Sequence, residues 1–368
     1  MRPSLRNIFF FIIGVTFTVF LFSIQYFELF GSRDLRQVPD RSRLVPVNNQ
    51  LPEDLPPVDC NCESEKSGKS YDFCYKNPHN PQLIGKKFDC SSLVHLENLA
   101  LVENSGPYQD LTQKTRDETS EVFVTAFSDN HYNEGSSEIS SIRKFYKTQK
   151  IIVYSLKLTK TYKEILAKEH PGIEIRDFEY SKYPKMVENW MEYRFKPLII
   201  SEVMKEYMNI WWIDAHVSVK KPGMRATLYT ELAEGLTENK NPLNSSILFF
   251  IHASHSNFAV MFPELLQYFP QPDLSLLKDE NRGAQLGANT IYIARTPHTI
   301  EIFKWWILCA LDSECMNPKG AQVFCHFKQD RYNYFANCYR FDQSVINLLL
   351  LNEQKDHHKY HASIGSSF

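Results

Sequence analysis

The stretch that decides the fold is Lys196-Pro-Leu-Ile-Ile-Ser-Glu-Val-Met-Lys-Glu-Tyr-Met-Asn-Ile-Trp-Trp-Ile-Asp-Ala-His216. Its first half predicts an amphipathic helix, because Ile199, Val203 and Tyr207 recur at four-residue spacing. The apolar run 210–213 that follows has no polar alternation, which is typical of a strand covered on both faces. A helix that leads directly into such a strand indicates an α/β fold.

Two side chains that can bind a metal follow this strand. Asp214 and His216 are two residues apart, so in an extended chain they point the same way. Open α/β sheets bind ligands beyond the carboxyl ends of their strands. The pair therefore predicts a site that holds a divalent cation against a phosphate. The alternative is a strand-end turn with an ordinary surface histidine.

Bulk composition and the N-terminal segment indicate where the protein works. The chain has 368 residues and a formal net charge of −2, which gives no support for a nucleic-acid partner. Residues 8–27 carry no charge, and about 20 helical residues span the ~30 Å hydrocarbon layer. We therefore expect a short cytoplasmic tail at 1–7 and a transmembrane signal-anchor helix at 8–30, with a cleaved signal peptide as the alternative.

The cysteines favour a lumenal main domain. They form two even groups, Cys60, Cys62, Cys74 and Cys90, and Cys309, Cys315, Cys325 and Cys338. Such groups predict two local disulfide sets and an oxidising compartment, although their pairing stays open. The arginines after the apolar run favour the opposite orientation. Giving the cysteines precedence, we expect a single-pass type II membrane glycoprotein of the Golgi or another secretory-pathway membrane.

The remaining chain divides by composition. Residues 31–118 are rich in proline and polar residues and predict a stem that carries the first cysteine group. From 119 to 352, strand and helix patterns alternate, which predicts a mainly parallel sheet flanked by helices. Expected strands cover 122–126, 151–154, 173–178, 210–213, 246–251 and 290–294. Expected helices include 160–169, 298–311 and 342–351. Residues 353–368 predict a polar C-terminal tail.

Five segments stand in the order found in a known group of proteins. They are Phe123-Val-Thr-Ala-Phe-Ser128, Ile151-Ile-Val-Tyr-Ser-Leu156, Arg194-Phe-Lys-Pro-Leu-Ile-Ile200, Trp211-Trp-Ile-Asp-Ala-His216 and Tyr339-Arg-Phe-Asp-Gln-Ser-Val-Ile-Asn347. Residues 119–352 thus resemble an uncharacterised domain-of-unknown-function family of membrane-anchored proteins related to GT-A glycosyltransferases. The resemblance implies a GT-A-like, Rossmann-like fold. It also implies transfer of a sugar from a nucleotide-diphosphate donor, such as a UDP-sugar, to a glycan or glycoprotein.

The resemblance also implies roles for individual residues. GT-A enzymes bind Mn²⁺ or Mg²⁺ with an Asp-x-Asp motif, and Asp214 and His216 fall on its two acids. The histidine departs from that motif, and imidazole suits Mn²⁺ better than Mg²⁺. Asp342 and Gln343 match an element near the donor sugar and acceptor, so they are the expected catalytic residues. The plain reading of Asp342 is a helix N-cap.

Residues expected to bind the donor come from three segments. They are Thr125, Ser128, Asn130, Arg194, Lys196, Gly287 and Asn289. The first three belong to the end of the strand 122–126 and the loop after it, and Arg194 and Lys196 could reach the diphosphate from a helix start. In GT-A folds a small residue such as Gly287 lets the sugar approach the backbone. The plain readings are a polar loop, a solvated basic pair and a turn glycine.

Other interpretations stay open at this point. The protein could be a catalytically inactive lumenal domain that binds glycans or partners, or a metal-dependent hydrolase that uses the same Asp214 and His216. The histidines His252, His255, His357, His358 and His361 are interpreted as surface residues rather than metal ligands. Trp190 could stack on a sugar ring.

Overall fold

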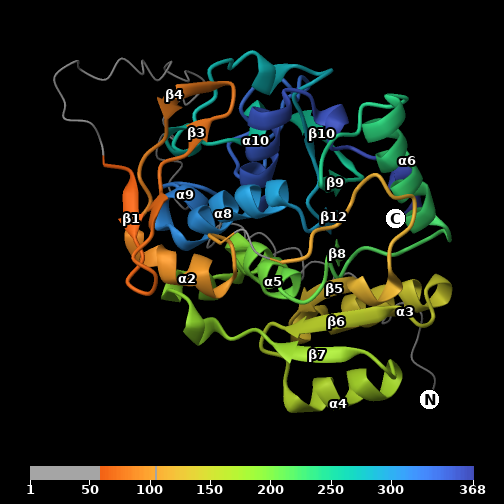
Figure 1. Cartoon of the computed structure of the whole chain (residues 1–368). Helices are drawn as coiled ribbons and strands as arrows, with labels where there is room; N and C mark the ends of the chain where they lie inside the picture. Colours follow the sequence, from red (N-terminus) through yellow and green to blue (C-terminus); the bar gives the residue numbers. More distant parts are fainter. Residues whose placement is uncertain (1–58, 104–105) are drawn as a thin grey trace, which may run out of the picture. The chain divides into compact units, whose positions relative to one another are not determined.

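The computed structural model describes residues 59–103 and 106–368, all within one compact unit, Asn48–Phe368 (Figure 1). The predicted cytoplasmic tail, the transmembrane helix at 8–30 and the first part of the stem lie outside the described residues. Across 59–103 and 106–368, no helix is long and apolar enough to cross a membrane.

A six-stranded sheet forms the centre of this unit, in the order β7-β6-β5-β8-β12-β9. The parallel strands are β7 (Glu174–Asp177), β6 (Lys150–Ser155), β5 (Glu121–Phe127) and β8 (Asn209–Ile213). β12 (Thr290–Ala294) runs antiparallel to both β8 and β9 (Ile247–Phe249). The predicted α/β fold with a mainly parallel sheet is confirmed.

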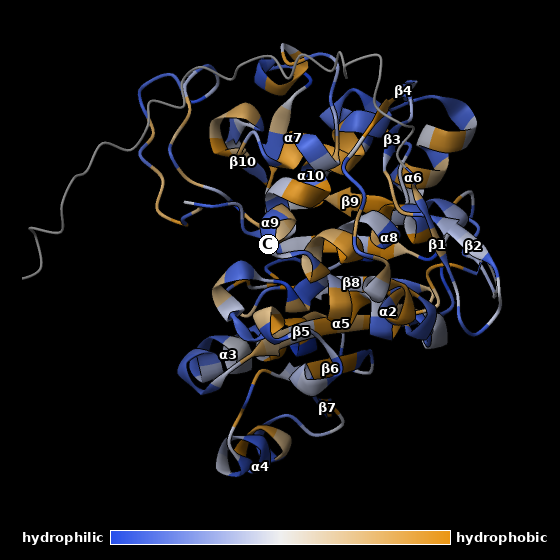
Figure 2. Cartoon of the chain, turned by 90° about the vertical axis from the view of Figure 1, so that its left-hand side faces the viewer, coloured by the Kyte–Doolittle hydropathy of each residue, from blue (hydrophilic) through white to orange (hydrophobic). Residues whose placement is uncertain are grey.

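Helices alternate with these strands. The longer ones are α3 (Tyr132–Phe145), α4 (Lys160–Glu169), α5 (Phe195–Met204), α6 (Met224–Glu238), α8 (Pro297–Leu311) and α10 (Asp342–Gln354). The shorter ones are α2 (Leu93–Asn98), α7 (Leu265–Tyr268) and α9 (Ser313–Met316). α8 contacts both α5 and α10. Figure 2 shows hydrophobic residues along β8, β9 and α10, in agreement with their burial.

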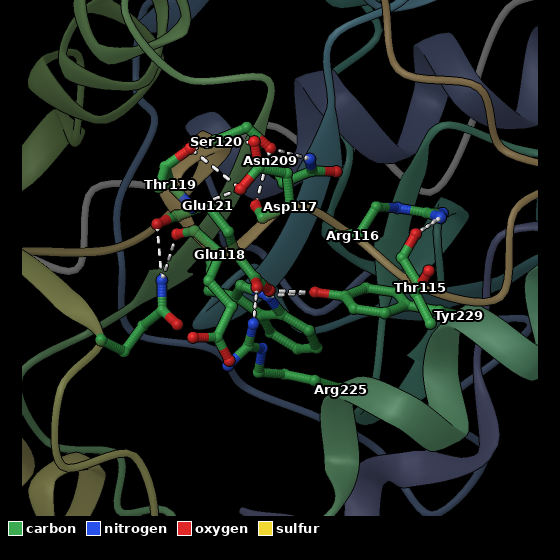
Figure 3. Close-up of polar contacts among 12 residues, drawn as sticks. Thr115, Arg116, Asp117, Glu118, Thr119, Ser120, Glu121, Asn209, Arg225 and Tyr229 are labelled. Carbon is green, nitrogen blue, oxygen red and sulfur yellow. Dashed lines mark hydrogen bonds and ion pairs between the residues drawn. The ribbon is translucent and has the colours of Figure 1, made fainter.

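A buried carboxylate opens the central strand β5 (Figure 3). Glu121 has no exposed surface and forms an ion pair with Arg225. It also accepts hydrogen bonds from the Tyr229 hydroxyl and, at 2.6 Å, from the indole N–H of Trp211. A buried charge is tolerated only when it is paired and hydrogen-bonded. These contacts join β5 to β8 and α6, a helix that was not predicted.

Residues 59–103 form part of the folded unit rather than a free stem. β1 (Asn61–Glu63) pairs with β2 (Ser70–Asp72), and β3 (Lys76–Asn77) pairs with β4 (Asn80–Ile84). The ring of Tyr75 lies edge-on against Phe269 at 5.2 Å and Trp305 at 5.5 Å. The predicted stem is therefore wrong for this segment, because its aromatic residues complete the core beside α7 and α8.

The eight cysteines pair within their two groups. The disulfides are Cys60–Cys74, Cys62–Cys90, Cys309–Cys315 and Cys325–Cys338. The predicted disulfide bonds in two local sets are confirmed. The last of these bonds lies within the loop 317–341, which leads from α9 into α10.

The C-terminal residues also pack against the sheet. Ala362 donates a backbone hydrogen bond to Phe249 at 2.9 Å, next to a parallel bridge between Phe249 and His361. Tyr360 is fully buried, and the ring of Phe368 stacks on Phe250 at 5.4 Å. Residues 353–368 are thus not a polar tail, because their aromatic residues extend the core beyond β9.

Candidate functional site

A cavity of about 580 Å³ lies where the parallel strands β5 and β8 end. This volume is within the usual range of about 300–1,000 Å³ for small-molecule sites. Its lining residues include Ser128 after β5, Asp214 and His216 after β8, Asn289 before β12 and Asp342 at the start of α10. Parallel strands place their carboxyl ends at one edge, so the local order of the sheet brings these segments together.

Lys196 is buried at this cavity between two carboxylates. It lies in the first turn of α5, and its side chain is only 3% exposed. Its ammonium is 3.1 Å from Asp214 Oδ1 and 3.0 Å from Asp342 Oδ2. It also donates to the carbonyl of Ala288 at 2.9 Å. The three charged groups therefore form one buried network, Lys196–Asp214–Asp342.

The network shifts the pKa values of its members. Burial alone would lower the pKa of Lys196, but the carboxylates of Asp214 and Asp342 outweigh it and raise that pKa. Burial raises the pKa of Asp342 to about 6; the Asp214 carboxylate adds to the rise and Lys196 opposes it. The lysine is thus cationic at any physiological pH, whereas Asp342 changes its charge near pH 6.

Asp214 and His216 offer a donor set that fits a divalent cation. Asp214 Oδ1 accepts the indole N–H of Trp212 at 2.6 Å, and the Asp214 amide donates to Asn289 at 2.8 Å. His216 is exposed, and its ring has no hydrogen-bond partner among the described residues. In the same cavity, Asn289 Oδ1 is buried without a hydrogen-bond partner. A carboxylate, an imidazole and an unsatisfied amide oxygen that line one cavity are ligand types that a divalent first-row metal could use.

The structure brings most of the predicted site residues to this cavity. Those that line it are Ser128, Lys196, Asp214, His216, Gly287, Asn289, Asp342 and Gln343. Gln343 acts through its side-chain amide: it accepts from the Ala288 amide at 3.0 Å and donates to Gln285 at 2.7 Å. The side-chain amide of Asn347 accepts from the Leu286 amide and donates to the Leu286 carbonyl, both at 2.9 Å. These amides thus fix the segment that precedes β12.

Three predicted donor contacts lie outside the cavity lining. Thr125 is fully buried in β5, and Asn130 is exposed and accepts from the Ser128 hydroxyl at 2.5 Å. Arg194 is 1% exposed and forms an ion pair with Glu192. It also donates to the carbonyls of Ala310 and Asp312, both at 2.7 Å. The guanidinium of Arg194 thus binds the carbonyl end of α8 and not the cavity, where a diphosphate contact was predicted.

Several residues that line the cavity were not among the predicted site residues. They include Tyr193, His255, Arg331 and Arg340. Trp190, a candidate for stacking on a sugar ring, also lines the cavity and is 52% exposed. Arg331 and Arg340 belong to the loop 317–341, which has no periodicity that a sequence could reveal.

The histidines of the C-terminal segment are not all surface residues. His357 is 2% exposed, and the rings of His252 and His361 lie 4.1 Å apart. Burial lowers the pKa of both His357 and His361 to about 4. His357 and His361 are therefore neutral packing residues at physiological pH. Of the three histidines, only His252 lines the neighbouring cavity.

The structure is that of an α/β protein with a cavity lined by charged residues at the carboxyl edge of its sheet. Residues 60–201 match the family described as protein of unknown function (DUF1647). The resemblance to an uncharacterised family, predicted for residues 119–352, is thereby confirmed for 119–201, and the match also covers the segment 60–118 with the first two disulfides. No curated protein matches the chain.

Three solved structures similar to the chain are those of a mannosyltransferase, a mannan synthase and a galactosyltransferase. The mannosyltransferase Ktr4p from S. cerevisiae aligns at 12% identity and a TM-score of 0.38, covering 72% of this chain and 76% of its own. Core-mannan synthase A from Aspergillus fumigatus, in a Mn/GDP form, aligns at 11% and 0.35, covering 67% and 76%. The galactosyltransferase LgtC with sugar analogues aligns at 12% and 0.33, covering 62% and 70%. Similarities of this size do not assign a reaction to this chain.

Proposed function

We propose that the protein is a glycosyltransferase that moves a sugar from a nucleotide-diphosphate donor to a glycan or glycoprotein. The observation that carries this proposal is the buried Lys196–Asp214–Asp342 network beside the unpaired His216. A GT-A-like arrangement would place the donor diphosphate next to Asp214 and His216, and a UDP-sugar is the donor we expect. The proposal further takes the enzyme to be anchored by residues 8–30 in the Golgi or another secretory-pathway membrane.

Positive charge near the leaving group would stabilise the transition state of sugar transfer. Transfer breaks the bond between the anomeric carbon and the diphosphate, which gains negative charge in the transition state. Asp214 and His216 would hold Mn²⁺ (or Mg²⁺), which supplies Lewis-acid stabilisation of that charge when bound. Trp212 and Lys196 orient the Asp214 carboxylate for this task.

We assign Asp342 to a sugar hydroxyl. It lines the cavity, and Lys196 fixes its carboxylate at 3.0 Å. A general base works best when its pKa is near the operating pH, and the pKa of Asp342 is raised to about 6. We propose that it orients a sugar hydroxyl or accepts the proton of the acceptor hydroxyl. Gln343 supports it by fixing the neighbouring backbone of Ala288.

Calorimetric titration tests the proposal on the detergent-solubilised full chain. UDP and UDP-sugars are titrated with and without Mn²⁺ into the wild type, Asp214→Ala and the control Glu118→Ala, whose side chain is 74% exposed. We expect Mn²⁺-dependent binding in the wild type and the control, and its loss in Asp214→Ala. Absence of such binding in the wild type contradicts the transferase and favours an inactive binding domain. Release of free sugar without transfer to any acceptor favours the hydrolase.

Topology needs a separate experiment. The four disulfides between described residues support an oxidising lumen for the folded unit. In sealed vesicles, we expect a protease added from the cytosolic side to leave residues 59–368 intact. Digestion of the folded unit under these conditions would reverse the proposed orientation.

A further inference from the structure

Two arginines on the cavity wall have no acidic partner. Arg331 and Arg340 line the cavity, and no carboxylate of the described residues lies within ion-pairing distance of either guanidinium. The Nε of Arg331 is buried and has no hydrogen-bond partner. Some other arginines do pair with a carboxylate, for example Arg176 with Glu206 and Arg225 with Glu121, whereas Arg116 and Arg143 bind backbone carbonyls. Within the described part of the chain, neither Arg331 nor Arg340 therefore has its charge compensated by a neighbouring carboxylate.

Both guanidinium groups line the same cavity as His255 and Tyr193. Burial lowers the pKa of Arg340; Tyr193 opposes this shift, and the charge of Arg331 adds to it. His255 lies near both arginines. Burial lowers its pKa to about 4, and the charges of Arg340 and Arg331 lower that pKa further. Its ring and the guanidinium of Arg331 both pack on Phe327, at 5.0 and 4.0 Å. An anion between Arg331 and Arg340 would relieve the repulsion of these like charges.

The segment that carries the arginines is held in place before any ligand arrives. The disulfide Cys325–Cys338 lies within the loop 317–341. Ser256 of β10 (His252–Ser256) donates its hydroxyl to the Tyr332 carbonyl at 2.7 Å and its amide to the Arg331 carbonyl at 3.2 Å. Ala336 donates to the Ala259 carbonyl at 2.8 Å. Binding sites gain affinity when their supporting contacts are already made.

We propose that Arg331 and Arg340 form a subsite for an acidic acceptor, a saccharide that carries carboxylate or sulfate groups. This rests on the proposed transferase function. Arg340 is two residues from Asp342, so an anion bound here lies next to the group we assign to the acceptor hydroxyl. Guanidinium groups bind carboxylate and sulfate through paired N–H donors. The exposed indole of Trp190 on the same cavity supplies an apolar face for a sugar ring.

Oligosaccharide binding without a nucleotide tests this subsite. The full chain is titrated with a hyaluronan tetrasaccharide, which carries carboxylates, a heparin tetrasaccharide, which also carries sulfates, and neutral chitotetraose. Arg331→Gln and Arg340→Gln are compared with the control Arg282→Gln, an exposed arginine outside the cavity. We expect the wild type and the control to bind at least one acidic probe more tightly than chitotetraose. Each cavity variant should lose that binding about tenfold or more.

The outcomes separate this inference from the proposed function. Equal binding of acidic probes by the wild type and both variants, or no preference over chitotetraose, overturns the subsite. If Mn²⁺-dependent UDP binding falls in both variants, the arginines hold the donor diphosphate and the assignment to the acceptor is wrong. A wild type that binds acidic saccharides but not UDP retains the subsite and loses the transferase. Arg331→Lys keeps the positive charge but lacks the paired N–H donors of a guanidinium. It should lose an intermediate part of the binding of acidic saccharides, which would show that the loss in Arg331→Gln is not caused by misfolding.

Discussion

The ammonium of Lys196 lies 3.0 Å from the carboxylate of Asp342, so an ion pair joins the first turns of helices α5 and α10. Asp214 completes the network from the end of β8. The pair is almost fully buried, with side-chain exposures of 3% and 6%. Its members therefore depend on each other far more than a surface pair would.

Replacing the lysine should destabilise the fold. Lys196→Met leaves two buried carboxylates side by side without their cation, and breaking a buried pair in this way costs about 3–5 kcal/mol. Denaturant unfolding followed by tryptophan fluorescence measures the loss. Lys86→Met is the control, because Lys86 and Glu314 are 49% and 71% exposed and such pairs contribute about 1 kcal/mol or less. The double variant Lys196→Met/Asp342→Asn should recover part of the loss; no recovery would contradict the coupling.

Asp342 should make stability depend on pH in a defined direction. Its pKa is raised to about 6, above the value of about 3.9 in an unfolded chain. Between these values the folded state keeps a proton that the unfolded state releases. The stabilisation from this group is therefore complete below about pH 4 and is lost as the pH rises through 6. The difference in unfolding free energy between the wild type and Asp342→Asn should decline over this window and stay flat above pH 7. A difference that grows with pH would contradict the burial of this acid.

The residue at position 216 should set the choice of metal. His216 is exposed, so His216→Asp is expected to leave the fold intact. Two carboxylates favour Mg²⁺ more than a carboxylate and an imidazole do. Nucleotide binding by His216→Asp should thus depend less on Mn²⁺ and be supported better by Mg²⁺ than in the wild type. Calorimetric titration of UDP in each metal measures this ratio, and an unchanged ratio argues that His216 is not a ligand.

The buried carboxylate of β5 should be essential for stability (Figure 3). Glu121→Gln removes the partner of Arg225, whose side chain is 14% exposed, at an expected cost of about 3 kcal/mol. Glu118→Gln is the matched control, because Glu118 is 74% exposed and 3.9 Å from the same arginine. Thermal or denaturant unfolding of both variants should show a large loss for Glu121→Gln only. Equal losses would mean that the pair with Glu121 does not contribute as its burial indicates.

Local patterns in the sequence predicted the sheet and the position of Asp214 and His216. An unbroken apolar run marks β8, and a helix start marks Asp342, so both could be placed without tertiary information. The burial of Lys196 between Asp214 and Asp342 could not be predicted from the sequence, because it depends on contacts among α5, β8 and α10. Arg194 and Lys196 looked equivalent in sequence. In the structure, Arg194 binds the end of α8, whereas Lys196 lies at the cavity.

Other differences between the predicted and the observed fold arise where the spacing of apolar residues is irregular or was overlooked. Residues 59–103 contain few helical patterns, and Tyr75 and Phe88 give no regular spacing that would predict their burial. Helix α6 did leave a signal, since Met224, Leu228 and Leu232 recur at four-residue spacing and are all buried. The arginines of the loop 317–341 come to the cavity through a disulfide and backbone contacts, which no local rule predicts.

The packing of residues 59–103 decides where the chain can be shortened for crystallisation as a secreted fragment. Asn77 donates to the Pro270 carbonyl at 3.0 Å, and Phe88 packs on Tyr268 at 5.0 Å. A fragment that starts at residue 119 would uncover the aromatic face beside α8, and exposed apolar faces of this kind promote aggregation. A fragment that starts ahead of Cys60 keeps both N-terminal disulfides and this face covered, which makes it the natural boundary for soluble expression.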